Sequence, residues 1–140
     1  MLLISLIIMK KQAKDVILHI TRREDWERAK RIGQYKADTL DTQGFIHCSL
    51  PRQILGVANS IYKGKRGLVL LCIDAQRLSA EVRYEEAESG DKYPHIYGPL
   101  NADSVIEAID FEPDEEGLFT LPKLDQPKTQ VLTRLEGLTA

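Results

Sequence analysis

This sequence has little of what marks several common protein classes. It has two cysteines, Cys48 and Cys72, and no two cysteines separated by two residues. It therefore has neither a disulfide framework nor a paired-cysteine metal or redox motif, which is typical of a reducing compartment. The net charge of −2 gives no general attraction to nucleic acid or acidic membranes. We expect a cytoplasmic protein without a nucleic-acid or membrane partner.

The chain also lacks a long hydrophobic run. Residues 2–8 are apolar, but they fall far short of the ~20 residues that span a bilayer. Lys10 and Lys11 follow this run, whereas a secretory signal carries its positive charge first. Two interpretations stay open: an additional strand, or a translation start at Met9. We predict an N-terminal extension at 1–15, one domain at 16–122 and a C-terminal tail at 123–140.

Standard catalytic motifs are absent from the sequence. It contains no GxSxG, HExxH or GxGxxG pattern and no glycine-rich phosphate loop. Any site must therefore be assembled from residues that lie on separate segments.

Hydrophobic patterning predicts an α+β domain. Residues 67–74 are apolar on both faces, as in a central strand, whereas residues 34–43 are polar and turn-prone. Thr21 and Glu24 form a capping box that predicts a helix start, with Trp26 and Ala29 facing inward. A second helix is predicted to begin at Ser49. Further strands are predicted at 16–20, 44–49, 81–86, 93–97 and 104–111, the last with Val105, Ile109 and Phe111 on one face. Two helices packed on a mixed sheet fit this order.

Histidine is the most informative residue type. The chain has three, and His19, His47 and His95 all lie in strand-like segments. Each has a hydroxyl two residues further on, at the alternation that puts two side chains on one face of a strand. Imidazole and hydroxyl groups together hydrogen-bond sugars and amides. We therefore predict a ligand site made of His19, Thr21, His47, Ser49, His95 and Tyr97.

Each of these residues also has a structural interpretation. A single strand histidine is more often a satisfied structural residue than a ligand, and Ser49 also fits a helix N-cap. Cys48 faces away from His47 and is predicted to be an inert buried thiol. A three-histidine zinc site stays an alternative, but the spacing does not support it, so we predict no metal site. The sequence also does not select a catalytic carboxylate among Glu81, Glu85, Glu86, Glu88, Asp91 and Glu107.

Several blocks of the sequence match one family. Residues 17–20, Trp26, the block Gly44-Phe45-Ile46-His47-Cys48-Ser49, Gln53, Pro94-His95-Ile96-Tyr97-Gly98-Pro99-Leu100 and Gly117-Leu118-Phe119 occur in its order and spacing. The chain therefore resembles the domain-of-unknown-function 952 family over about residues 16–122.

The resemblance implies an ADP-ribosyltransferase-like fold, a split pair of small sheets that holds NAD in a cleft. His19 then matches the histidine that binds the NAD ribose, and His47 the residue on the nicotinamide side. Many members of that superfamily add a catalytic glutamate, which has no match here. RNA 2′-phosphotransferases also lack it and use basic residues on the phosphate, but that basic set is not evident in this sequence.

From these observations we predict a domain that binds NAD or a similar small nucleotide, with ADP-ribosyl or related transfer as its reaction. His19 and His47 are the best catalytic candidates, and NAD would be a substrate, not a resident cofactor. The alternative is a non-catalytic binding or accessory module that has lost the chemistry. A histidine-based metal hydrolase is third. The sequence leaves the acceptor and the oligomeric state open.

Overall fold

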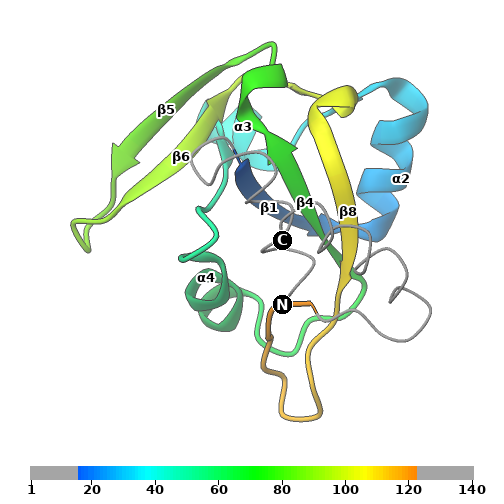
Figure 1. Cartoon of the computed structure of the whole chain (residues 1–140), viewed down its shortest axis with the longest axis vertical. Helices are drawn as coiled ribbons and strands as arrows, with labels where there is room; N and C mark the ends of the chain where they lie inside the picture. The colour runs from blue at the N-terminus through cyan, green and yellow to red at the C-terminus, as the bar shows by residue number, and fades with distance from the viewer. Residues whose placement is uncertain (1–15, 123–140) are drawn as a thin grey trace, which may run out of the picture.

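The computed structural model describes residues 16–122, so the predicted extension and tail lie outside the described residues. The fold is α+β, as predicted, but residues 16–122 contain three α-helices instead of two, and antiparallel sheets instead of one mixed sheet (Figure 1). The helices are α2 (Arg23–Ile32), α3 (Asp38–Thr42) and α4 (Ile54–Ile61). The longer strands are β1 (Val16–Arg22), β4 (Leu68–Asp74), β5 (Glu81–Glu86), β6 (Lys92–Tyr97) and β8 (Val105–Phe111). Three two-residue strands complete the set: β2 (Gln34–Tyr35), β3 (Ile46–His47) and β7 (Leu100–Asn101).

Two three-stranded sheets organise the described residues. One has the order β1–β4–β8 and the other β3–β6–β5, while β2 pairs with β7. Every residue of β4 is buried, which confirms the predicted central strand. A bridge between Leu18 and Ser49 joins the two larger sheets through reciprocal backbone hydrogen bonds of 2.8 Å. The β5–β6 hairpin extends away from the rest of the fold (Figure 1).

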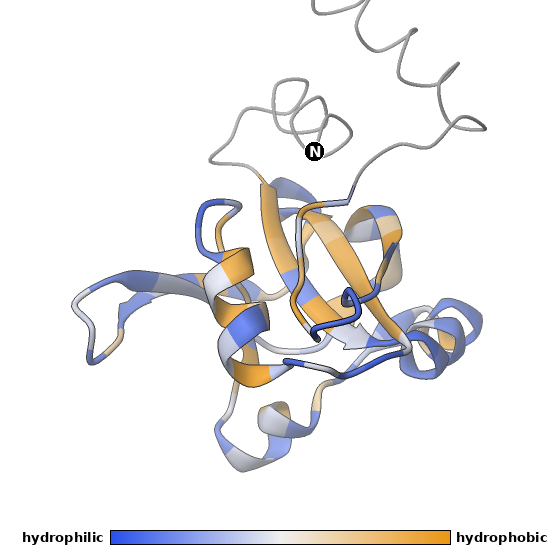
Figure 2. Ribbon diagram, turned by 90° about the horizontal axis from the view of Figure 1, so that it is seen from below, coloured by the Kyte–Doolittle hydropathy of each residue, from blue (hydrophilic) through white to orange (hydrophobic). Residues whose placement is uncertain are grey.

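Alternation along β1 separates two hydrophobic clusters. Leu18 and Ile20 pack with α4 and Phe111, whereas Ile17 on the opposite face packs with Trp26 of α2. The helix α2 turns Trp26 and Ala29 inward, as predicted, but Ile32 is 66% exposed. Figure 2 shows the hydrophobic residues concentrated on the central strands and the hydrophilic ones on the β5–β6 hairpin.

Both predicted helix starts are wrong. The strand β1 continues through Thr21, which pairs with Val69, and α2 begins at Arg23 without a side-chain cap. Thr21 is buried beside Tyr35, so strand pairing and burial outweigh the local capping pattern. The helix α4 begins at Ile54, whereas Ser49 lies in the bridge to Leu18.

A register shift changes one predicted face. Cys72 pairs with Glu107 and its neighbour Ile73 pairs with Val105, so Ile106 is an extra residue in β8. Such a bulge reverses the alternation of side chains beyond it. Val105 therefore packs with the hydrophobic cluster that contains Ile17 and Trp26. Ile109 and Phe111 pack with the other cluster, which contains Leu18 and the buried face of α4.

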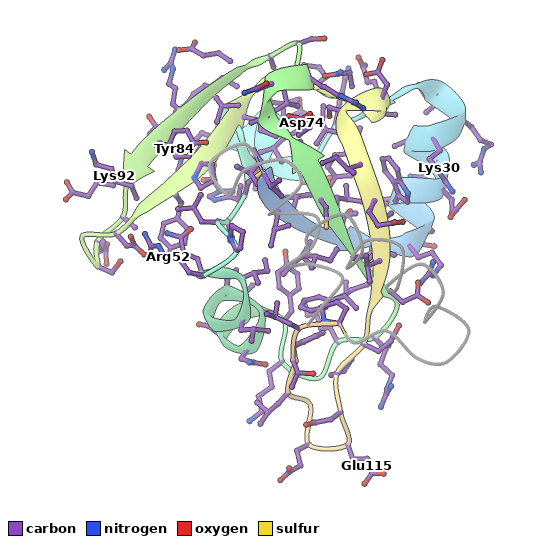
Figure 3. All side chains as sticks on the ribbon, in the orientation of Figure 1. Lys30, Arg52, Asp74, Tyr84, Lys92 and Glu115 are labelled. Atoms are coloured by element: carbon purple, nitrogen blue, oxygen red, sulfur yellow. The ribbon has the colours of Figure 1, made fainter. Side chains whose placement is uncertain are left out.

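Buried Gln53 anchors the β5–β6 hairpin. Its Nε2 donates to Asp91 Oδ2 at 2.9 Å and to the Lys92 carbonyl at 2.8 Å, while its Oε1 accepts from the Leu50 N–H at 2.8 Å. Arg52, which is labelled beside the β5–β6 hairpin in Figure 3, adds two hydrogen bonds to Asp91. These hydrogen bonds, those of Arg52 first, lower the pKa of Asp91 to about 2. The contacts fix the start of β6, the strand that carries His95.

No helix within residues 16–122 combines the length and the apolar character needed to cross a bilayer.

Candidate functional site

Strand register brings two of the three histidines together. His47 of β3 lies opposite His95 of β6, which in turn lies opposite Arg83 of β5. The two imidazole centroids are 5.2 Å apart, with their planes near perpendicular. Tyr97, two residues beyond His95, shares this face of the sheet because strand side chains alternate. Three of the six predicted ligand residues therefore lie on one surface.

Phe45 lies at the centre of this surface. Its ring stacks on His95 with a centroid distance of 4.1 Å and lies 4.8 Å from His47 and 5.2 Å from Tyr97. The ring is partly exposed, as are His95 and Tyr97. We define the histidine face as Phe45, His47, Glu85, His95 and Tyr97. It offers aromatic rings and polar atoms to one ligand.

Glu85 connects the two β6 side chains of the histidine face. Its Oε1 accepts a hydrogen bond from the Tyr97 hydroxyl at 2.6 Å and one from His95 Nδ1 at 2.7 Å. These two hydrogen bonds, that of Tyr97 first, lower the pKa of the Glu85 carboxyl. Arg83 lies over the Tyr97 ring, 4.2 Å from its centroid. Glu85 is therefore an ionised carboxylate. The sequence alone could not select it from the six acidic candidates.

His47 is the most exposed member of the histidine face. Its Nε2 lies 3.0 Å from the side-chain oxygen of Gln43, at the end of α3. Partial burial, followed by the nearby His95, lowers the pKa of the His47 imidazole. The ring is therefore largely neutral at pH 7 and can exchange its Gln43 contact for a ligand.

His19 lies behind this surface and is 7% exposed. Its Nδ1 lies 2.6 Å from the His47 carbonyl oxygen, which only accepts, so Nδ1 carries the proton. Its Nε2 then accepts from the Tyr35 hydroxyl at 2.9 Å, and Tyr35 also hydrogen-bonds the Thr21 side chain. Burial lowers the pKa of His19 to about 4. The imidazole is neutral, in one tautomer, with both nitrogens engaged.

The six predicted residues thus form two groups and one separate member. His47, His95 and Tyr97 share the histidine face, whereas His19 and Thr21 meet at Tyr35. The hydrogen bond from His19 to the His47 carbonyl joins the two groups. Ser49 is 4% exposed and pairs through its backbone with Leu18.

Sequence reasoning missed Phe45 and Tyr35 as site residues, and it named Glu85 only as one of six candidate carboxylates. Phe45 is two residues before His47, so the alternation that grouped His47 with Ser49 also pointed to it. Glu85 and Tyr35 meet their histidines only through tertiary pairing, for which the sequence has no local signal.

Both thiols are buried, as predicted for Cys48. Cys48 is 4% exposed and Cys72 fully buried. Burial raises the pKa of both, that of Cys72 to about 12, so neither is a nucleophile in the folded protein. Within residues 16–122, no group of three or more His, Cys, Asp or Glu side chains has the geometry to hold a metal ion.

Comparison with known proteins places the chain in a family. The model of the proteins of unknown function called DUF952 matches residues 20–108. This chain belongs to the DUF952 family. The match contains Phe45, His47, Glu85, His95 and Tyr97, so the whole histidine face lies within the DUF952 region. No curated protein matches the chain.

Two solved structures have the same fold as this DUF952 chain. The crystal structure of protein CC0527 from Caulobacter crescentus is 28% identical with a TM-score of 0.70, and the match covers 84% of this chain and 98% of that one. The solution NMR structure of CC0527 is 30% identical with a TM-score of 0.68, covering 76% and 93%. The similarity establishes the α+β fold for this DUF952 member and assigns no ligand.

Proposed function

We propose that this chain binds a nucleotide-type ligand, with NAD as the candidate, on the histidine face. The observation that carries the proposal is Glu85, held by His95 and Tyr97 beside a partly exposed Phe45 ring. A flat base stacks on exposed aromatic rings, and such stacking contributes about 1–3 kcal/mol per base. The neighbouring imidazole, hydroxyl and carboxylate groups are hydrogen-bond partners for ribose hydroxyls and a carboxamide.

The arrangement of the sheets supports an ADP-ribosyltransferase-like fold, which is part of the proposal. Two small sheets joined by the bridge between Leu18 and Ser49 resemble the split pair implied by the family resemblance. The two residues matched to that superfamily, His19 and His47, are joined by a hydrogen bond.

Glu85 is the proposed catalytic carboxylate for group transfer. The bond between ribose C1′ and the nicotinamide nitrogen breaks, and nicotinamide leaves with the bonding electron pair. Positive charge develops on the ribose, and an ionised carboxylate stabilises it. The lowered pKa of Glu85 keeps it ionised at neutral pH. Water or another hydroxyl then supplies an electron pair to C1′ and loses its proton to solvent.

His19 has a positioning role in this proposal. Its Nδ1 hydrogen bond holds the His47 backbone, and its Nε2 is occupied by Tyr35. A direct contact of His19, Thr21 or Ser49 with ribose requires these buried groups to exchange partners, and it stays a prediction.

Calorimetric titration of the full chain with NAD, ADP-ribose and nicotinamide tests the binding. His47→Ala is compared with Glu88→Gln, which changes an exposed carboxylate on the hairpin turn. His47→Ala should weaken NAD binding, whereas Glu88→Gln should leave it unchanged. No heat at millimolar NAD contradicts the proposal.

The reaction is tested by chromatography of nicotinamide released from NAD. Release by the wild type that Glu85→Gln abolishes and Glu88→Gln preserves supports the transferase. Binding without release supports the non-catalytic module instead. Metal analysis of protein without a histidine tag tests the hydrolase, which requires stoichiometric zinc.

A further inference from the structure

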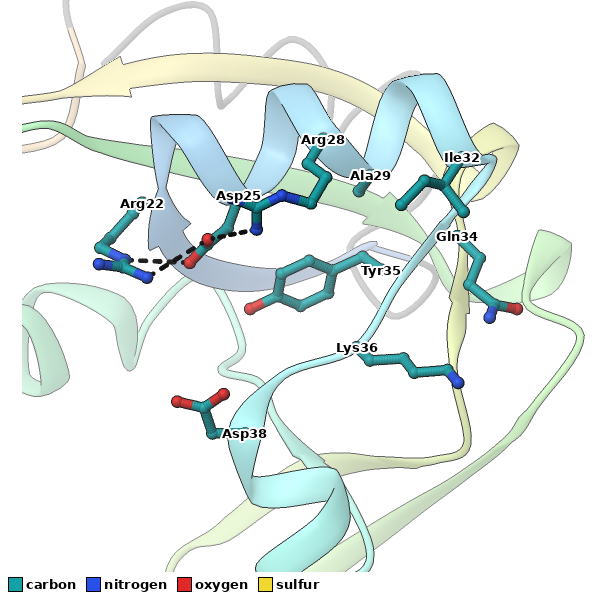
Figure 4. Close-up of a pocket in the computed structure, with 9 residues that line it drawn as sticks. All are labelled: Arg22, Asp25, Arg28, Ala29, Ile32, Gln34, Tyr35, Lys36 and Asp38. Carbon is teal, nitrogen blue, oxygen red and sulfur yellow. Dashed lines mark hydrogen bonds and ion pairs between the residues drawn. The ribbon is translucent and has the colours of Figure 1, made fainter.

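A second candidate site lies between α2, β2 and the start of α3. It is a cleft of about 390 Å³, and none of the residues that line it belongs to the histidine face (Figure 4). A volume of this size is in the range of small-molecule pockets. Polar and apolar surface contribute about equally to the lining, and its charged or polar members include Arg22, Asp25, Arg28, Tyr35, Lys36 and Asp38.

Two guanidinium groups at the cleft are oriented by one carboxylate. Arg22 Nε lies 3.0 Å from Asp25 Oδ2, and Arg28 Nη1 lies 3.2 Å from Asp25 Oδ1. Arg22 also pairs with Glu24 through Nη1 at 3.3 Å. Each guanidinium has five N–H donors, so these pairs still leave donors on both arginines for a ligand. Asp25 therefore orients both arginine side chains before a ligand binds.

Lys36 and Asp38 complete the charge pattern. Figure 4 shows their side chains extending in different directions on either side of Tyr35. Within residues 16–122, the Lys36 ammonium makes no hydrogen bond or ion pair, and neither does the side-chain amide of Gln34. The lining has three cations against two carboxylates, and Glu24 outside the lining pairs with Arg22 at 3.3 Å. The charges therefore balance in number, and Lys36 is the cation of the lining that has no ion pair among residues 16–122. An anionic group matches the cations, while the carboxylates require hydrogen-bond donors such as hydroxyls.

Tyr35 forms a rigid inner wall of the cleft. It is 7% exposed, and its hydroxyl is held by His19 and Thr21. Burial raises the pKa of this hydroxyl to about 12, so it stays protonated. The aliphatic side of the cleft comes from Ala29 and Ile32 of α2. A ring that carries hydroxyl groups fits such a wall.

We infer that the cleft binds a phosphorylated sugar, with the phosphate on Arg22 and Arg28 and the sugar hydroxyls on Lys36 and Gln34, at the other end of the cleft. Phosphate oxygens accept charge-assisted hydrogen bonds from guanidinium groups, and sugar hydroxyls accept hydrogen bonds from ammonium and amide groups. The ligand has two potential sources, a free sugar phosphate or the ribose phosphate of a larger nucleotide. The inference does not depend on the histidine face binding a ligand.

The test is an NMR titration of the ¹⁵N-labelled full chain with ribose 5-phosphate. Ribose and inorganic phosphate, titrated separately, report on the two halves of the ligand. We expect amide shifts at Gln34, Tyr35 and Lys36, and tighter binding of ribose 5-phosphate than of either half. Ribose 5-phosphate that binds no better than phosphate alone overturns the inference.

Matched variants separate the cleft from general charge effects. Lys36→Ala and Arg28→Ala should each weaken binding roughly tenfold, as expected for the loss of one charge-assisted hydrogen bond. Lys63→Ala and Arg31→Ala remove the same charges from exposed positions outside the cleft and should bind as the wild type does. Because Lys36 is exposed and unpaired, its variant should keep the wild-type amide spectrum. Equal affinities of Lys36→Ala and Lys63→Ala overturn the inference.

ADP-ribose distinguishes the two sources of the ligand. Shifts in the cleft and on the histidine face with one dissociation constant identify the phosphate of a nucleotide. Ribose 5-phosphate shifting the cleft while ADP-ribose does not bind identifies a free sugar phosphate. In that second case the cleft inference stands, and the NAD titration decides the proposed function separately.

Discussion

Acidification should destabilise this protein well before its carboxylates are protonated, because His19 is buried in the neutral form. The pKa of His19 is about 4 in the folded protein, whereas an unperturbed histidine has a pKa of 6.5. Between these values the unfolded chain binds a proton that the folded chain does not. Stability is therefore full above about pH 7 and is lost as pH falls through 6.5 toward 4.

The size of the effect follows from the shift. Protonation of the unfolded state lowers the free energy of unfolding by about 2 kcal/mol at pH 5 and by about 3 kcal/mol at pH 4. Asp91, whose pKa is lowered to about 2, adds to the loss at more acidic pH, so the range from pH 7.5 to 5 isolates the histidines. His47, whose pKa is also lowered, acts in the same direction.

Urea unfolding at a series of pH values measures this dependence. His19→Asn should flatten the curve between pH 7.5 and 5 by about 2 kcal/mol. The comparison uses the change with pH within each protein, so a lower absolute stability of the variant does not affect it. Arg31→Asn, at an exposed position of α2, should keep the wild-type slope. Equal slopes for wild type and His19→Asn, or an NMR titration of His19 with a midpoint near 6.5, would show that His19 is not buried in the neutral form.

Three further predictions follow from buried groups. Tyr35→Phe leaves a buried imidazole nitrogen without its donor and should lower the free energy of unfolding by about 1–3 kcal/mol in urea denaturation. Tyr62→Phe, whose hydroxyl makes no hydrogen bond within residues 16–122, should change it by under about 0.5 kcal/mol. Gln53→Ala leaves the Leu50 N–H without its acceptor, so thermal unfolding should show a similar loss of about 1–3 kcal/mol; an unchanged melting temperature contradicts the anchoring role. Cys48 and Cys72 should react with a thiol reagent only after unfolding in guanidinium, and rapid modification of the native protein would disprove their burial.

The alternation of side chains along strands could be predicted from the sequence, and it correctly assigned most strand faces. The two faces of β1, the fully buried β4 and the shared face of His95 and Tyr97 all follow from this local rule. The rule failed at β8, because the bulge at Ile106 reversed the faces, and a bulge leaves no mark in hydrophobic spacing.

Short elements and tertiary pairing could not be predicted. The strands β2 and β7 have two residues each and α3 has five, too few for any periodic pattern. Thr21 carried a capping signal, yet pairing with Val69 kept it in β1. Glu85 reaches His95 and Tyr97 only because the turn after β5 sets its register against β6. The candidate site therefore needed both local alternation and non-local register.

The central claim is that the histidine face binds a nucleotide-type ligand such as NAD. The test is long-range ¹H–¹⁵N NMR of the three imidazoles during an NAD titration. We expect the ring nitrogens of His47 and His95 to shift and to saturate together. The nitrogens of His19 should keep their positions, because Tyr35 and the His47 carbonyl hold them. If the signals of His47 and His95 stay unchanged at millimolar NAD, the histidine face does not bind it.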